Sequence, residues 1–285
     1  MTPTDKRNRL RAILNGKRCV SPITVYDALS ARVADAAGFE VGLLSGSVCA
    51  ATTLAAPDLA LQTLTEFADQ VRRIARGSDL SLFVDADQGY GNALNAMRAV
   101  EELEHAGLSG LAIEDLVMPA RFGATSAFEL VPVEEMAGKL RAALRARRDP
   151  SLVIVARSAA LKAGPLEQTV ARARAYAATG VDAVFITGLK KLEELDAIRA
   201  VVGLPIVAGT APLLGREDLE SRGVRLALQG HTPIAAIVKA LHDTYAHLRA
   251  GGSPAELKGK IASPEEMNRL LGAERYAALQ RDHLA

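Results

Sequence analysis

The sequence contains no tryptophan and only two cysteines, Cys19 and Cys49, among its 285 residues, and aromatic residues make up only 4% of it. This scarcity of aromatic rings disfavours a base-stacking platform for nucleic acids and an aromatic site for sugars. Two cysteines are too few for a disulfide framework or for a zinc site built from cysteines. The cysteine content therefore favours a reducing compartment, and we expect a cytoplasmic protein.

An excess of charge of one sign is also missing. The chain has 34 Lys and Arg residues against 33 Asp and Glu residues, a net charge of +1, whereas binders of nucleic acid or of an anionic membrane need a basic face. No run approaches about eighteen apolar residues, so we expect no membrane span. The basic residues Lys6, Arg7, Arg9 and Arg11 precede no long apolar run of the kind found in secretory signals, and we expect a solvated first helix.

Four glycines, Gly38, Gly107, Gly180 and Gly223, each follow a helix-like stretch and precede a short apolar run. Glycine readily adopts the left-handed conformation that ends a helix. A short and nearly continuous apolar run is typical of a parallel strand that is buried on both faces. With four further runs of this kind, the predicted strands cover residues 20–25, 41–45, 82–85, 110–114, 152–156, 183–187, 205–208 and 225–229.

Amphipathic stretches separate these strands and predict helices. The clearest cover residues 30–37, 65–74, 93–106, 133–146, 167–179, 192–201 and 233–248. Eight strands that alternate with helices over about 230 residues predict an α/β fold of the (β/α)8 TIM barrel type. A doubly wound open sheet is the alternative, but it normally carries a glycine-rich phosphate loop after its first strand, which residues 24–30 do not provide.

The predicted barrel occupies residues 1–250 and ends at the hinge-like stretch Ala250–Pro254. Residues 251–285 form a predicted C-terminal helical extension. Within it, Ser263 is a candidate N-cap, followed by proline and then Glu266. The helix that follows has an apolar stripe, which must be buried either on its own barrel or on a neighbouring subunit. Both arrangements remain open at this point.

Carboxylates follow two neighbouring predicted strands, at the end of a TIM barrel where catalytic groups lie. Asp85 and Asp87 end the third strand and are two residues apart, which places them on the same side of an extended strand. Glu114 ends the fourth strand. Converging carboxylates repel one another unless a cation neutralises them, and a site with only oxygen ligands indicates Mg2+ or Mn2+. The alternative for each of them is a helix cap or an ion pair.

Two side chains that can carry a positive charge lie at the ends of other strands. Arg157 ends the fifth strand, where a guanidinium needs an anion, either a substrate carboxylate or Glu114. His231 follows the eighth strand and is a candidate functional residue only because of its place at the active face, since a lone histidine is more often structural.

The remaining candidates contribute binding groups. After the second strand, backbone N–H groups of Ser45, Gly46 and Ser47 can reach an anion, unless the stretch is an ordinary tight turn. Tyr26 and Asp27 end the first strand. Asp58 lies in the loop after the second strand and says little by itself, because Pro-Asp is common in turns.

Several of these residues belong to motifs that resemble the isocitrate lyase/phosphoenolpyruvate mutase superfamily. The motifs follow in order and cover residues 26–32, 37–40, 45–47, 85–92 and 113–115, and the resemblance extends from about residue 10 to residue 250. It implies a barrel with Mg2+ at its mouth, with Mn2+ as the alternative ion, and a small α-oxycarboxylate substrate. It also implies homotetramers, dimers of dimers in which paired subunits exchange a helix.

Within this superfamily the chain is most similar to the oxaloacetate decarboxylase branch, through residues 55–58, 89–95, 122–123, 139–144, 156–157 and 230–231. The resemblance implies that Ser47, Arg157 and His231 contact the substrate and that Asp85 carries the metal. Asp87, Glu114 and Asp58 would hold metal-bound waters. The expected reaction is Mg2+-dependent decarboxylation of oxaloacetate to pyruvate and CO2 through an enolate that the metal stabilises.

The sequence departs from the family pattern in two places. The loop Pro119–Ala124 has neither the cysteine and histidine of the lyases nor the lysine and asparagine of the mutases. Ser158 and Ala159 replace the Thr-Asn pair that usually follows the arginine in the decarboxylase branch. Cleavage of a C–C or C–P bond in another 2-oxo or 2-hydroxy acid remains an alternative, as does a barrel that binds a keto acid without catalysis.

Overall fold

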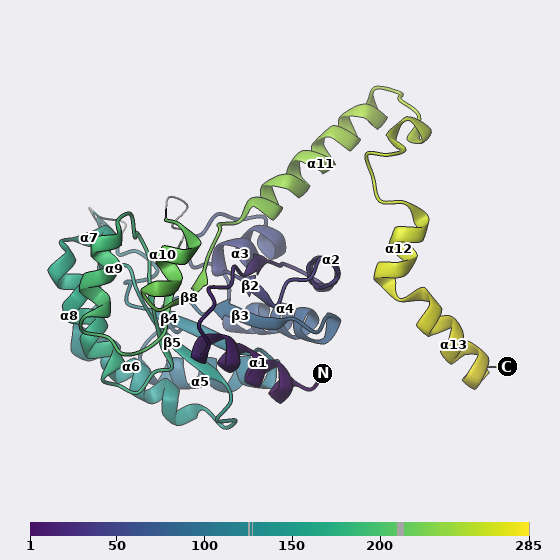
Figure 1. Ribbon diagram of the computed structural model, residues 1–285. Coiled ribbons are helices and arrows are strands. Elements are labelled where there is room, and N and C mark those ends of the chain that lie inside the picture. Colours follow the sequence, from purple (N-terminus) through teal and green to yellow (C-terminus); the bar gives the residue numbers. More distant parts are fainter. Residues whose placement is uncertain (125, 127, 210–213, 285) are drawn as a thin grey trace.

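The eight strands form one parallel sheet in sequence order, β1 to β8, in the computed structural model, which describes residues 1–124, 126, 128–209 and 214–284. Two hydrogen bonds join Val20, just before β1, to β8, from Val20 N to Arg225 O (2.9 Å) and from Ala227 N to Val20 O (3.0 Å). The sheet thus curls into a TIM-like barrel (Figure 1). The strands are β1 (Ile23–Thr24), β2 (Val41–Leu44), β3 (Ser81–Asp85), β4 (Gly110–Glu114), β5 (Val153–Ser158), β6 (Ala183–Ile186), β7 (Ile206–Ala208) and β8 (Val224–Ala227).

Helices connect the strands and form the outer layer, as the sequence predicts for a TIM-type fold. They are α1 (Pro3–Asn15), α2 (Ala28–Ala36), α3 (Gly46–Leu54), α4 (Leu64–Gly77), α5 (Ala93–His105), α6 (Val133–Ala146), α7 (Ala160–Ala163), α8 (Leu166–Ala177), α9 (Leu192–Arg199), α10 (Arg216–Ser221) and α11 (Thr232–Arg249), followed by the 3-10 helix η1 (Pro254–Leu257), α12 (Pro264–Leu271) and α13 (Ala273–Leu284).

Local capping explains several helix starts. The Thr63 and Glu66 side chains cap the start of α4 reciprocally, and Ser263 caps α12, the latter as predicted. The helix α3 is not among the predicted helices. It begins directly after β2 because the Ser45 hydroxyl accepts a hydrogen bond from Val48 N (3.2 Å) and caps the helix. The stretch that the sequence offered as a binding loop or a tight turn is therefore the start of a helix.

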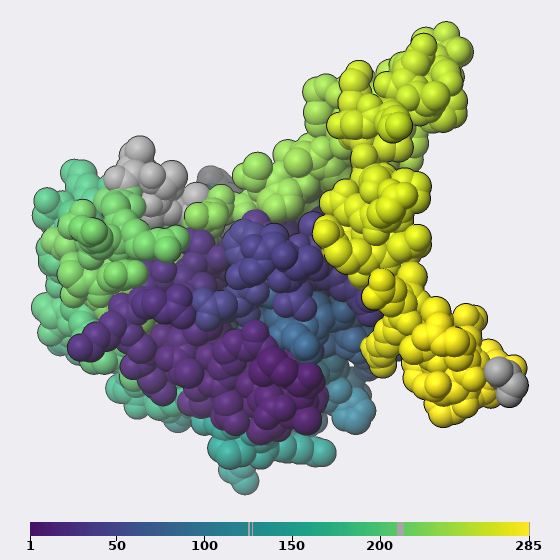
Figure 2. Space-filling view, turned by 45° about the vertical axis from the view of Figure 1, so that its right-hand side comes forward, coloured from purple at the N-terminus to yellow at the C-terminus, as the bar shows by residue number. Residues whose placement is uncertain are grey.

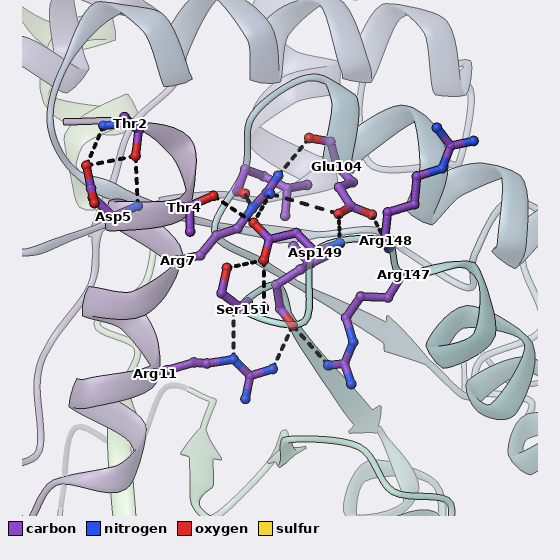
Figure 3. Close-up of polar contacts among 12 residues, drawn as sticks. Thr2, Thr4, Asp5, Arg7, Arg11, Glu104, Arg147, Arg148, Asp149 and Ser151 are labelled. Carbon is purple, nitrogen blue, oxygen red and sulfur yellow. Dashed lines mark hydrogen bonds and ion pairs between the residues drawn. The ribbon is translucent and has the colours of Figure 1, made fainter.

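Helix α1 closes the N-terminal end of the barrel, which corrects the expectation of a solvated first helix. Lys6 and Arg7 are each only 6% exposed. Arg7 donates from Nε to Leu108 O (3.0 Å) and from Nη1 to Asp149 (2.7 Å), and Arg11 donates to Ser151 O (2.8 Å) (Figure 3). Basic side chains at this end satisfy carbonyl groups of the loops that enter the strands, a role that a charge pattern alone does not reveal.

The barrel interior is filled by side chains from the strands and from α1. Leu10 is fully buried there together with Phe83 and Val155, among others. At Gly110 a Cβ atom would lie 2.9 Å from Leu10 Cδ2, so the glycine makes room for the leucine. A filled interior leaves the opposite end, where the strands terminate, as the place for a site.

The C-terminal helices leave the barrel. No residue of α11 is buried, and the helix projects outward from the end of β8 (Figure 1). The chain then returns past the barrel (Figure 2), and α12 contacts α2. There Arg32 Nη1 donates to Leu270 O (3.0 Å). Within the described part of the chain, no helix combines the length and the apolar character that a membrane span requires.

Candidate active site

A cavity of about 270 Å³ opens where the strands end. Three of the predicted functional side chains line it, namely Asp85 at the end of β3, Arg157 in β5 and His231 after β8. Ser45 also contributes, and apolar walls come from Leu43, Phe83, Phe185 and Leu228. The remaining lining residues are Lys162, Thr187, Gly188 and Gly209.

The segment after β3 is shaped by tight backbone contacts. The strand ends at Asp85, and Asp87 has a left-handed backbone with φ of 45°, so the alternation of an extended strand does not reach Asp87. Its carbonyl oxygen accepts a hydrogen bond from Glu114 N (2.8 Å), which ties the segment to β4. A side chain at Gly46 would bring Cβ within 2.5 Å of Asp87 Oδ1, so only glycine fits against this carboxylate.

Arg157 links the two strands that carry the acids. Its Nη1 donates a hydrogen bond to Asp85 Oδ2, and its Nη2 lies 3.1 Å from Glu114 Oε2. The guanidinium also lies 5.3 Å from the centroid of the Phe185 ring. Burial lowers the pKa of Arg157, but the Asp85 and Glu114 carboxylates outweigh this effect and raise the pKa above its usual value.

Burial and, to a smaller extent, repulsion among the acids shift their pKa values. Burial, followed by the charges of Asp85 and Glu114, raises the pKa of Asp87 to about 8. Burial also raises the pKa of Glu114 to about 7, although Arg157 opposes the rise. Loss of hydration and the nearby Asp85 raise the pKa of Asp58. The site thus holds more negative charge than one guanidinium neutralises, and protons occupy part of it near neutral pH.

These residues fit a divalent cation. The Oδ1 atom of Asp85 is buried without a hydrogen-bond partner, which is costly unless a cation or a polar ligand supplies the interaction. The donors are carboxylate oxygens, which suit Mg2+. Over the described residues, no three Asp, Glu, His or Cys side chains are close enough to enclose an ion by themselves.

His231 is oriented by the first strand. Thr24 Oγ1 lies 3.0 Å from His231 Nδ1 and donates to Gly230 O (3.1 Å). Burial lowers the pKa of His231, while Asp85 acts in the opposite direction. The imidazole is therefore mainly neutral at pH 7, held in place at the wall of the cavity.

A buried polar network fixes the ends of β4 and β5. Asp115 is fully buried and accepts hydrogen bonds from Ser158 Oγ (2.8 Å), Ala159 N (3.0 Å) and Tyr176 Oη (2.9 Å). Arg172 Nη1 donates to the same carboxylate (3.2 Å). Because Ser158 and Ala159 directly follow Arg157, this network determines where the backbone carries the guanidinium.

The other predicted residues lie around the cavity or away from it. Ser47 Oγ is 2.9 Å from Ser45 Oγ, at the first turn of α3. Asp58 is exposed in the segment between α3 and α4. Tyr26 and Asp27 do not line the cavity, and they border a separate apolar groove beside α2. There Asp27 caps the helix through Ser30 N (2.6 Å).

Two residues of the site escaped sequence reasoning. Thr24 lies within a predicted strand and had no signal beyond its place near the strand end. Lys162 lies on the four-residue helix α7, five residues after Arg157, and lines the same cavity. A lysine on a short helix after a strand carries no signal in the sequence that separates it from an ordinary surface lysine.

Known proteins resemble the chain over almost its full length. Residues 10–249 match the family model described as phosphoenolpyruvate phosphomutase. A protein of Bradyrhizobium diazoefficiens named oxaloacetate decarboxylase is 50% identical over 268 residues, which cover 93% of this chain and 92% of the relative. A protein of the same name from Rhodopseudomonas palustris (strain ATCC BAA-98 / CGA009) is 50% identical over 272 residues, which cover 95% and 94%.

Solved structures agree with these sequence matches. A phosphonopyruvate hydrolase in complex with oxalate and Mg2+ is 31% identical, with a TM-score of 0.88 and coverage of 100% of both chains. A 2,3-dimethylmalate lyase, described as a member of the PEP mutase/isocitrate lyase superfamily, is 26% identical, with a TM-score of 0.85 and coverage of 99% and 95%. The chain therefore belongs to the phosphoenolpyruvate mutase/isocitrate lyase superfamily, as its motifs predicted.

Proposed function

We propose that the protein is a carboxy-lyase that decarboxylates oxaloacetate to pyruvate and CO2. The observation that carries this conclusion is the meeting of Asp85, Arg157 and His231 in one small cavity at the barrel mouth. Relatives that are 50% identical over at least 92% of each chain carry the name oxaloacetate decarboxylase. A cavity of about 270 Å³ suits a small keto acid rather than a bulky one.

Asp85 would hold Mg2+ directly, and Asp87, Glu114 and Asp58 would hold the water around the ion. The buried and unpartnered oxygen of Asp85 and the raised pKa values of Asp87 and Glu114 support this assignment. When bound, Mg2+ supplies Lewis-acid stabilisation of the negative charge that develops on the keto oxygen as CO2 leaves. A relative of known structure was solved with Mg2+, and Mn2+ has the same preference for oxygen ligands.

Arg157 would bind the carboxylate next to the keto group. Its planar guanidinium suits paired contacts with a carboxylate, and Asp85 and Glu114 hold it at the cavity wall. The Ser45–Ser47 stretch would add donors to the same carboxylate, from the Ser47 hydroxyl and from backbone N–H groups in the first turn of α3. These contacts orient the substrate before the bond breaks.

His231 would contact the polar end of the substrate. The hydrogen bond with Thr24 fixes the ring at Nδ1, which leaves Nε2 for the ligand. Because Thr24 Oγ1 donates its own proton to Gly230 O, Nδ1 of His231 donates to Thr24, and Nε2 must carry a proton as well to donate to a carboxylate oxygen of the substrate.

Cleavage of a C–C or C–P bond in another acid is less well supported. The loop Pro119–Ala124 offers no cysteine, histidine or lysine to act as an acid or base. A screen of oxaloacetate, methylisocitrate and phosphonopyruvate under the same conditions separates these reactions. Binding of Mg2+ and a keto acid without turnover of any of the three would favour a barrel that has lost catalysis.

The direct test is the formation of pyruvate from oxaloacetate in the presence of Mg2+, measured above the background caused by the free ion. We expect a rate that is proportional to enzyme concentration and is abolished by a chelator. A rate that never exceeds the background would contradict the proposed reaction. Full activity with the chelator present would leave the reaction standing and contradict the role of the ion.

The C-terminal helices favour a homotetramer, a dimer of dimers whose paired subunits exchange helices. None of the residues of α11, α12 or α13 is buried. Large apolar side chains are exposed along them, at Val238, Tyr245, Leu271 and Tyr276 among others. An exposed stripe of this kind requires a partner surface. Light scattering should give the mass of four chains, and a monomeric mass at micromolar concentration would contradict the exchange.

The cysteines support a cytoplasmic location. Cys19 and Cys49 are buried and unpaired, and burial raises the pKa of both thiols, which keeps them protonated and unreactive. Cell fractionation should recover the protein with cytoplasmic markers, and recovery with the periplasmic or membrane fraction would contradict this location.

A further inference from the structure

One cationic side chain of the cavity has no role in the mechanism above. Lys162 lines the same cavity as Asp85 and Arg157. It is exposed, and its ammonium group makes no ion pair with any carboxylate of the described residues, so its charge is available at the cavity mouth. In contrast, Arg157 is already engaged by Asp85 and Glu114.

Two contacts hold Lys162 across the mouth of the barrel. Gly188, after β6, has φ of 92°, and a Cβ atom there would lie 2.9 Å from Lys162 Cγ. The missing side chain at Gly188 therefore leaves the space in which the stem of the lysine runs. At the other end, the Nζ atom lies 5.4 Å from the centroid of the Phe128 ring, within range of a cation–π interaction. The stem and the head are both positioned, so the ammonium stays near the cavity.

We propose that Lys162 binds the second carboxylate of the substrate and thereby sets the preference of the cavity for 2-keto dicarboxylic acids over monocarboxylic ones. A dicarboxylate carries two negative charges into the cavity, where Arg157 already forms ion pairs with Asp85 and Glu114. Lys162 supplies a cation at the mouth, beyond the inner wall that holds the first carboxylate. This inference rests on the proposed decarboxylation only for its kinetic consequences, since the binding preference exists without turnover.

The kinetic consequences follow from the charge that disappears during the reaction. The second carboxylate of oxaloacetate leaves as neutral CO2, so its attraction to an ammonium group is strongest before the bond breaks. Such an interaction lowers KM and does not raise kcat. Replacing a residue that binds the leaving carboxylate should therefore raise KM, whereas replacing a catalytic residue should lower kcat.

The test compares Lys162→Met, Lys162→Arg and Lys190→Met. Methionine keeps an unbranched stem and removes the charge, arginine keeps the charge, and Lys190 is an exposed lysine near the end of β6 that does not line the cavity. With Lys162→Met we expect KM for oxaloacetate to rise about fivefold, as for the loss of one partly exposed ion pair of about 1 kcal/mol, with kcat not reduced. Lys162→Arg should retain the preference for the dicarboxylate because it keeps the charge, and Lys190→Met should stay close to the unchanged enzyme.

Binding is measured separately, by calorimetry in Mg2+ buffer with 3,3-difluorooxaloacetate as the dicarboxylate and pyruvate as the monocarboxylate. Lys162→Met should weaken the binding of the first and leave the second unchanged. Equal changes for both ligands, no change for either, or the same change in Lys190→Met would overturn the proposal, as would a fall in kcat at constant KM. If the unchanged enzyme releases no CO2, the proposed function fails, and the calorimetric comparison still decides the role of Lys162.

Discussion

Arg157 donates a hydrogen bond to the Oδ2 atom of Asp85, the carboxylate that we propose as the direct ligand of Mg2+. The other oxygen of that carboxylate, Oδ1, is buried without a partner. One side chain thus offers one oxygen to the guanidinium and retains the other for a cation. The arginine that we propose to bind the substrate and the carboxylate that we propose to bind the metal are therefore in direct contact, although they lie 72 residues apart in sequence.

Replacing Asp85 tests this shared role. Asp85→Asn keeps the shape of the side chain but removes its charge, so the ion loses its ligand and Arg157 loses an ionic partner. We expect kcat/KM for oxaloacetate to fall by at least about a hundredfold. Pyruvate formation at saturating Mg2+ measures the change. Asp69→Asn, at an exposed carboxylate that pairs with Arg72 on α4, is the matched control, and equal losses in both variants would contradict the assignment.

The raised pKa values of Asp87 and Glu114, to about 8 and about 7, predict a pH-dependent stability of the metal-free protein. An acid whose pKa is raised in the folded state binds its proton more tightly when folded, so the free energy of unfolding falls as pH rises towards the folded pKa. The lowered pKa of His231 has the opposite effect below about pH 6.5. Between pH 6.5 and about 8, we therefore expect Tm in the presence of a chelator to decrease.

Added Mg2+ should raise Tm more at pH 8 than at pH 6.5, because binding of the ion requires ionised carboxylates and displaces protons. Differential scanning calorimetry measures how Tm changes with pH, both without metal and with added Mg2+. The Asp87→Asn variant removes one of the two titrating acids and should flatten the decrease. A Tm that rises over this interval without metal, or a stabilisation by Mg2+ that shrinks with pH, would contradict the assignment of these acids.

The Asp115 network predicts a joint loss of stability and activity. In Asp115→Asn, the buried Arg172 loses its ionic partner, which should cost about 3–5 kcal/mol of the free energy of unfolding. Tyr176→Phe removes one hydrogen bond to the same carboxylate and should cost about 1 kcal/mol. Urea unfolding measures both values. Because the network holds Ser158 and Ala159 beside Arg157, Asp115→Asn should also lower kcat/KM, and unchanged kinetics would show that the network has no influence on the site.

The packing of α1 against the N-terminal end of the barrel should contribute stability without affecting catalysis. Leu10 is fully buried between α1 and the strands, so Leu10→Ala should lower the free energy of unfolding by about 2–5 kcal/mol. The kinetic constants of the folded variant should not change, because the cavity lies at the opposite end of the barrel. Leu94→Ala, at a leucine that is 73% exposed, should change stability by less than about 0.5 kcal/mol. A large loss of kcat in Leu10→Ala would contradict this separation.

The strands were predictable because each carries its own signal. A glycine such as Gly180 ends a helix, the apolar run after it has no polar face, and the structure confirms all eight predicted strands within a few residues. The motifs around Asp85 and Glu114 indicated the superfamily correctly. Ser45 was harder to interpret, since a serine after a strand starts a turn or a helix equally well, and the hydrogen bond to Val48 N decides for the helix.

The order of strands and helices, the superfamily and the acids at the strand ends were predictable, because they depend on local periodicity and on motifs of adjacent residues. The three-dimensional structure was needed to show that Lys6 and Arg7 are buried under the barrel, that Arg157 bonds to Asp85, and that Lys162 runs over Gly188 to the cavity. Those contacts join residues far apart in the chain, and their geometry depends on how the closed barrel brings strand ends and loops together in space.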